Sequence, residues 1–170
     1  YAVLAGEDPQ LDKVLKDGPL VEKNLTVRAV KFFADGALGS RGAALLQPYS
    51  DDPNNEGLLV ATENDLATNV ARVAKAGFQP CVHAIGDRAN RIVLDIFEHT
   101  LSAEQRAQLR PRVEHAQVIS QRDLPRFAQL GVIASMQPTH ATSDMPWAQA
   151  RLGAERLQGA YAWATLKSGG

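Results

Sequence analysis

Short apolar runs typical of β-strands alternate along this chain with segments that have helical periodicity. The clearest strand-like runs cover residues 26–34, 79–85, 112–118 and 132–137. Parallel strands need a crossover connection, which is usually a helix, so this alternation predicts an α/β fold with a parallel sheet and flanking helices. The run at 26–34 is apolar on both faces, as a doubly covered parallel strand requires.

Capping residues mark where the intervening helices begin and end. Thr62, with Asp65 three residues later, predicts the start of a helix that Gly77 ends. A second helix is expected at 88–99. Ser120 is expected to cap a third, which Gly131 closes. Weaker patterns indicate a strand from Tyr1 to Leu4, a helix at 11–16, and a peripheral, mostly helical tail at 147–167.

The spacing of these units predicts a barrel. His83 and His115 are 32 residues apart, close to the roughly 30 residues of one unit in a (β/α)8 barrel of roughly 250 residues. Lys31 and His83 are 52 apart, and the excess is a Gly/Pro/Asn-rich loop at 36–57 that follows a strand. We therefore expect a barrel-like α/β domain, with this loop on the active-site face.

Composition excludes several classes of protein. The chain is 45% hydrophobic and 22% charged with a net charge of −1, and no basic block favours nucleic acid or a membrane surface. No apolar run approaches the roughly 20 residues of a membrane span. We expect a cytoplasmic location, with export left open because no native N-terminus is visible. The single cysteine, Cys81, excludes a disulfide framework and is expected to be a small buried hydrophobe.

Three candidate metal ligands sit near the carboxyl ends of successive strand-like runs. They are Lys31, His83 and His115, and neutral imidazoles are ligands for zinc or a similar divalent ion. Strand alternation is expected to place Val113, His115 and Gln117 on one face, so that the three candidates converge if those faces point into the barrel. A snorkelling Lys31 and hydrogen-bonded structural histidines are the alternatives.

Four further residues are candidates for substrate binding: Asp35, Arg41, Asp87 and His140. Turn or capping roles for the two aspartates, a surface ion pair for Arg41 and a loop position for His140 are the alternatives. Glu114 is not counted as a ligand, because in a regular strand it would point away from His115.

The motifs that carry these residues resemble the amidohydrolase superfamily. They are Val-Lys-Phe-Phe-Ala-Asp-Gly, Pro-Tyr-Ser-Asp-Asp-Pro, Val-His-Ala-Ile-Gly-Asp, Arg-Val-Glu-His-Ala-Gln and Ser-Met-Gln-Pro-Thr-His. They occur in order from about Val27 to the end of the chain. The resemblance is to the branch that contains N-substituted formamide deformylase.

The resemblance implies a metal-dependent (β/α)8 hydrolase in which Lys31, often carboxylated in the family, ligates one or two divalent ions, most simply zinc, together with His83 and His115. Two family features have no counterpart here: the His-x-His pair of the first strand and the general-base aspartate after the eighth. The resemblance therefore implies that residues 1–170 form a single incomplete TIM-barrel domain, about strands 3 to 7, with no complete catalytic set.

The leading hypothesis is a segment of a hydrolase that acts on C–N bonds of small non-peptide amides, inactive as a fragment. One alternative is a non-catalytic fragment that forms homo-oligomers through exposed sheet edges, or a weak metal-binding scaffold. Another is a metal-free barrel enzyme that uses Lys31 as a Schiff-base amine. Nucleic acid and membranes are not expected as partners.

Overall fold

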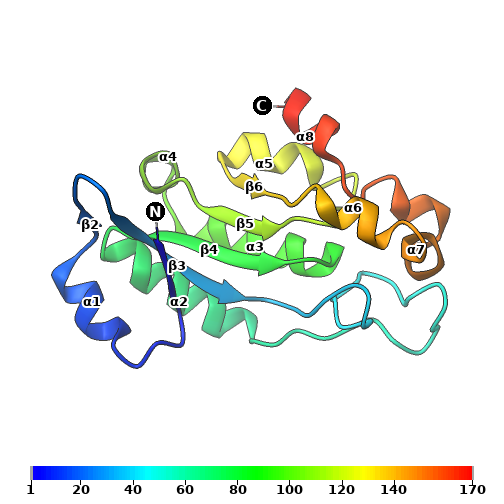
Figure 1. Ribbon diagram of the computed structural model, residues 1–170, viewed down its shortest axis with the longest axis horizontal. Helices are drawn as coiled ribbons and strands as arrows, with labels where there is room; N and C mark the ends of the chain where they lie inside the picture. The colour runs from blue at the N-terminus through cyan, green and yellow to red at the C-terminus, as the bar shows by residue number, and fades with distance from the viewer. Residues whose placement is uncertain (1, 170) are drawn as a thin grey trace.

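The computed structural model describes residues 2–169 and shows a parallel sheet with flanking helices (Figure 1). The strands are β1 (Ala2–Ala5), β2 (Leu20–Val21), β3 (Thr26–Phe33), β4 (Gln79–Ala84), β5 (Arg112–His115) and β6 (Ile133–Ser135). The helices are α1 (Leu11–Asp17), α2 (Glu63–Lys75), α3 (Asp87–Thr100), α4 (Ala103–Leu109), α5 (Leu124–Leu130), α6 (Thr139–Asp144), α7 (Ala148–Leu157) and α8 (Trp163–Gly169). Tyr1, the first residue of the predicted N-terminal strand, lies outside the described residues.

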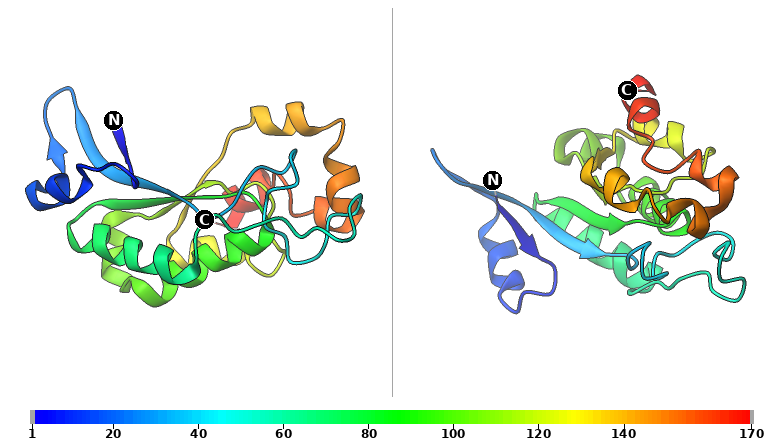
Figure 2. Two further views of the ribbon diagram at one scale, coloured as in Figure 1. Left: turned by 90° about the horizontal axis from the view of Figure 1, so that it is seen from below. Right: turned by 45° about the vertical axis from the view of Figure 1, so that its right-hand side comes forward.

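The sheet has the order β1-β3-β4-β5-β6, with every neighbouring pair parallel, while the short β2 pairs antiparallel with β3. This confirms the predicted α/β class. Helices α2 and α3 run along one face of the sheet (Figure 2). Within residues 2–169, no helix is both long enough and apolar enough to cross a membrane.

The two faces of the sheet differ in chemistry. Val30, Val82 and Val113 point toward the helices and belong to the main apolar core, with Leu66 of α2 and Phe97 of α3. The opposite face of β3 carries residues that are only partly covered, so the prediction that both faces are buried is wrong for the end of this strand. Phe33 is 44% exposed there.

Local capping explains some of the helix boundaries. The Thr62 hydroxyl accepts a hydrogen bond from the Asp65 amide at 3.1 Å, as predicted. Gly131 ends α5 in the left-handed conformation, also as predicted. Ser120 does not cap α5, because the helix begins at Leu124 and its N-cap residue is Asp123.

The C-terminal tail is helical, and its part around α7 is not peripheral, which corrects the sequence-based expectation there, whereas α8 has no buried residue. The 36–57 loop and α7 lie at the same end of the molecule (Figure 1). A second apolar core joins them to the ends of β4 and β5, through Leu38, Ala43, Leu45, Tyr49, Ile85, Val118, Leu152 and Ala160. The Arg156 guanidinium donates to the carbonyls of Gln47 and Pro48, at 2.8 Å each. The loop is therefore packed in place by a segment more than 90 residues further along the chain.

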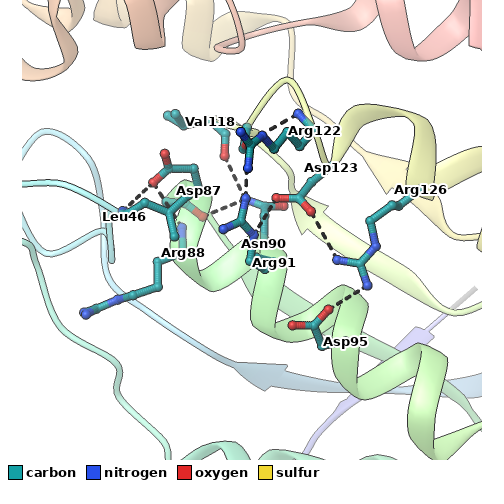
Figure 3. A network of polar contacts seen from close by, with 12 residues as sticks. Leu46, Asp87, Arg88, Asn90, Arg91, Asp95, Val118, Arg122, Asp123 and Arg126 are labelled. Carbon is teal, nitrogen blue, oxygen red and sulfur yellow. Dashed lines mark hydrogen bonds and ion pairs between the residues drawn. The ribbon is translucent and has the colours of Figure 1, made fainter.

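Asn90 of α3 joins three segments at the carboxyl end of the sheet (Figure 3). Its side-chain amide is fully buried and donates to the carbonyls of Ala84 at 3.1 Å, Gly86 at 2.9 Å and Val118 at 3.1 Å. One side chain thus links the turn between β4 and α3 to the segment after β5. This contact fixes where α3 starts relative to the end of β4.

Replacing Asn90 with alanine is expected to lower the free energy of unfolding by about 2 kcal/mol, because buried carbonyls lose their donor. Urea denaturation of the purified chain measures the change. Asn69→Ala on α2, whose side chain is only half-buried, is the matched control and should change stability by less than about 0.5 kcal/mol. Equal midpoints for the two variants would contradict this role of Asn90.

Candidate metal centre

The side chains of Lys31, His83 and His115 gather at the carboxyl end of the sheet, on the face away from α2 and α3. The imidazole rings of His83 and His115 lie 4.6 Å apart between centroids, edge to face. The Lys31 amine lies 4.5 Å from the centre of the Phe33 ring, which is itself 5.4 Å from the His83 ring. Sequence reasoning therefore selected residues that the fold brings together.

The route by which His115 reaches this site differs from the prediction. In the sheet register, His83 lies beside Glu114, not beside His115. Side chains alternate, so a regular strand would turn His115 toward the helices. Instead β5 ends here, because His115 and Ala116 both adopt positive φ, 75° and 44°. This kink swings the His115 ring back over the sheet, and the predicted shared face of Val113, His115 and Gln117 does not exist.

Glu114 is a site neighbour that sequence reasoning missed. It is 8% exposed, and its carboxylate accepts a hydrogen bond from the Arg112 Nε at 2.7 Å. It lies on the same face as Lys31, where burial lowers the pKa of the Lys31 amine and the Glu114 charge opposes that shift. Only the cross-strand register could have revealed Glu114 as a neighbour of the site. Alternation along β5, counted from His115 on the site face, places Glu114 on the opposite face.

Each histidine has one ring nitrogen engaged with the protein. The Nε2 of His83 lies 3.3 Å from the Asp35 carboxylate and 3.4 Å from the Gly36 carbonyl. The Nδ1 of His115 lies 2.7 Å from the side-chain oxygen of Gln137. Such contacts orient metal-binding histidines and leave the opposite nitrogen for the ion. By this logic Nδ1 of His83 and Nε2 of His115 are the ring nitrogens left for an ion.

Electrostatics favour the neutral form of His115. Burial lowers the pKa of this imidazole, and the nearby His83, Lys31 and His140 side chains lower it further, although the Gln137 contact acts in the opposite direction. A neutral imidazole has a free lone pair and is the form that binds metal. The pair is therefore chemically suited to a divalent ion.

The carboxylate of Asp35 forms its hydrogen bonds with the protein backbone. Its Oδ1 accepts from the Ile85 amide at 3.0 Å, and its Oδ2 accepts from the amides of Ala44 at 2.9 Å and Gly86 at 2.8 Å. The side chain is fully buried. Substrate binding by Asp35 stays a prediction, and the contacts observed are with backbone donors and His83.

The other predicted substrate residues lie in different surroundings. His140 of α6 stacks on His115, with centroids 5.5 Å apart and planes inclined by 25°. Arg41 forms a two-pronged pair with Asp51 in the 36–57 loop, at 3.1 Å for each bond. Asp87 is buried and accepts from the Leu46 amide at 2.9 Å. The structure thus brings His140 next to the candidate ligands, while Arg41 and Asp87 bind parts of the protein.

Across residues 2–169, no three His, Cys, Asp or Glu side chains come close enough to form a metal cluster by themselves. What this part of the chain offers is two histidines with Lys31 on the same face. Such a set is suited to part of a coordination shell.

Two curated relatives match nearly the whole chain. Protein LONG AFTER FAR-RED 3 of Arabidopsis thaliana is 38% identical over 160 residues, which are 94% of this chain and 27% of that protein. The amidohydrolase YtcJ of Bacillus subtilis is 39% identical over 161 residues, 95% of this chain and 29% of that protein. The chain thus spans less than a third of the length of either relative.

Two solved structures have the same fold. An uncharacterized metal-dependent hydrolase of Pyrococcus furiosus superposes with a TM-score of 0.86 at 37% identity, over 99% of this chain and 34% of that one. An uncharacterized metal-dependent hydrolase of Pyrococcus horikoshii superposes with a TM-score of 0.88 at 35% identity, over 99% of this chain and 33% of that one. The parallel sheet with its flanking helices is thus the architecture of one part of a metal-dependent hydrolase. The family profile described as the Amidohydrolase family matches residues 10–170, and the chain belongs to that family.

Replacing Asp35 with asparagine is expected to destabilise the chain by about 2–3 kcal/mol, because an amide NH₂ would then face backbone donors that now bind a carboxylate. Urea denaturation measures the loss. The exposed Asp17, changed to asparagine, is the control. An Asp35→Asn variant as stable as the control would show that the carboxylate charge and the hydrogen bond lost to the NH₂ group contribute nothing.

Proposed function

We propose that this chain is the middle part of a metal-dependent hydrolase that acts on C–N bonds of small non-peptide amides. The observation that carries the proposal is the His83–His115 pair, in which each ring is oriented by its own protein partner and the opposite nitrogen remains for an ion. Lys31 on the same face completes the candidate set. Membership of the amidohydrolase family supports the reaction class.

The donor set fits a divalent ion such as zinc. Two neutral imidazoles are common zinc ligands. Lys31 fits if its amine is carboxylated, because a carbamate supplies an anionic oxygen and removes a positive charge from a half-buried position. Zinc, the carboxylated lysine, a complete (β/α)8 barrel and the formamide-type substrate branch are parts of this proposal and rest on the resemblance of the motifs.

The residues of this chain would each have a defined task. Asp35 and Gln137 hold the two imidazoles in position, and burial keeps His115 neutral. When bound, the ion would polarise the substrate carbonyl and lower the pKa of a water. His140 lies over His115 and is the side chain best placed to contact the substrate. Arg41 and Asp87 would act on substrate only indirectly, by holding the 36–57 loop.

The general base and further ligands would come from outside residues 1–170. The relatives are more than three times as long as the matched region, which leaves room for a His-x-His pair and for the family aspartate. We therefore expect this chain alone to be inactive. Hydrolysis of amides by the purified chain, abolished by a chelator, would contradict that expectation.

Metal binding tests the proposal in the intact protein that contains this sequence. His83→Ala and His115→Ala should each weaken zinc binding by at least about tenfold, the scale of loss seen even for groups that only orient a ligand. Metal content after dialysis and zinc titration provide the measurement. His99→Ala is the matched control, because His99 is exposed on α3 and contacts only the Asp95 carbonyl among the described residues.

Unchanged zinc binding in both His83→Ala and His115→Ala would exclude the proposed centre. The reaction class is tested separately, by screening N-substituted formamides and related small amides against the metal-loaded intact protein. Binding of zinc without hydrolysis of any amide would keep the centre and reject the substrate class.

Exposed edges of the sheet favour a second candidate, a non-catalytic scaffold that self-associates. β1 and β6 are the outer strands of the described sheet, and an open edge is a template for pairing with another strand. Light scattering coupled to size exclusion should then give a mass above that of one 18.4 kDa chain. A well-behaved monomer at micromolar concentration would count against this candidate.

A further inference from the structure

Helix α6 lies beside the candidate metal centre without an apolar anchor of its own. It has six residues, and Asp144 is the one that is buried. Apolar burial normally holds a short helix in place, because isolated short helices are marginal in water. The position of α6 must therefore depend on polar contacts at its ends.

Two side-chain hydrogen bonds tether this segment to the end of β5. Before the helix, the Gln137 side-chain oxygen lies 2.7 Å from Nδ1 of His115. At its last residue, Asp144 accepts a hydrogen bond from the side-chain amide of Gln117 at 2.7 Å. His115 and Gln117 are two residues apart, so residues 137–144 form an arch over the end of this strand. His140 lies in the middle of the arch.

The Asp144 tether is a buried, closed cluster. One carboxylate oxygen, Oδ2, accepts from both Gln117 and the Tyr161 hydroxyl, the latter at 2.9 Å. The other, Oδ1, accepts from the Ser143 hydroxyl at 2.8 Å. The Tyr161 amide in turn donates to the Gln117 carbonyl at 2.8 Å. The cluster therefore joins three separate segments: the end of β5, α6 and the chain after α7.

Tyr161 is well suited to this role. Burial raises its pKa, and the Asp144 carboxylate raises it further, so the phenol stays protonated and remains a donor. Its backbone has a φ of 52°, a left-handed conformation that is uncommon for a residue with a large side chain. The fold holds Tyr161 in this conformation, and its hydroxyl reaches Asp144.

We propose that Asp144 and Tyr161 are positioning residues that fix α6 as a wall beside His115 and thereby hold His140 in the substrate space. His140 lies four residues before Asp144, on the same side of the helix, and its ring stacks on His115. The wall itself follows from the hydrogen bonds described above. The substrate contact of His140 rests on the proposed function.

Hydrogen exchange of the purified chain tests the wall without metal or substrate. Asp144→Ala and Tyr161→Phe should speed amide exchange across residues 139–145, by about tenfold or more for Asp144→Ala, the factor that loss of a charged hydrogen-bond acceptor implies. Asp144→Asn should retain protection, because the asparagine oxygen can accept from both Gln117 and Tyr161 while Ser143 rotates to accept from its NH₂. Met145→Ala, at a residue 73% exposed, is the neighbouring control.

The ring signals of His140 provide a second readout, since stacking on His115 shifts them. Asp144→Ala should move the His140 ring resonances toward those of His115→Ala, where the stacking partner is gone, while Asp144→Asn should leave them in place. Unchanged exchange and unchanged His140 signals in Asp144→Ala would overturn the positioning role.

The substrate part is tested in the intact, metal-loaded protein with an amide that it hydrolyses. His140→Ala and Asp144→Ala should each raise KM more than they lower kcat, and the double variant should be no worse than His140→Ala alone, because Asp144 acts through His140. Additive effects would overturn that link. If the variants change amide exchange across residues 139–145 but the intact protein hydrolyses no amide, the proposed function is rejected. The role of Asp144 and Tyr161 in positioning α6 then still holds.

Discussion

The carboxylate of Asp35 is the interaction on which the site depends. It accepts hydrogen bonds from the backbone amides of Ile85 and Gly86, where β4 passes into α3, and of Ala44 in the 36–57 loop. The same group lies 3.3 Å from the His83 ring. A buried carboxylate is costly unless its hydrogen bonds are satisfied, and here three backbone donors from two segments satisfy it. Strand end, loop and histidine are thus fixed by one side chain.

Polar contacts of this kind recur around the centre. Asn90 donates a hydrogen bond to the Ala84 carbonyl at the end of β4, Gln137 orients His115, and Asp144 binds Gln117 and so links α6 to the chain after β5. Apolar packing acts one layer away, in the core under the sheet and in the second core between the loop and α7. Packing therefore sets where the elements lie, while the hydrogen bonds set where the side chains of the site point.

The Thr62 and Gly131 caps and the parallel strand order were predictable because they depend on local propensity and on the alternation of strand-like and helix-like segments. Lys31, His83 and His115 were recognisable because each interrupts or ends an apolar run. Glu114 was missed because β5 was assumed to be regular up to His115. The part of the tail around α7 was wrongly placed at the periphery because its packing against the 36–57 loop depends on contacts between segments distant in sequence.

By itself, the sequence determined the α/β class, the order of the units and the choice of candidate metal ligands, because periodicity and residue chemistry are local properties. Only the tertiary structure decided how these residues meet. The left-handed turn at His115 and Ala116 reverses the direction that alternation would give. That conformation is unfavourable in isolation, and the contacts of Gln117 with Asp144 and Tyr161, segments distant in sequence, are what stabilise the turned chain.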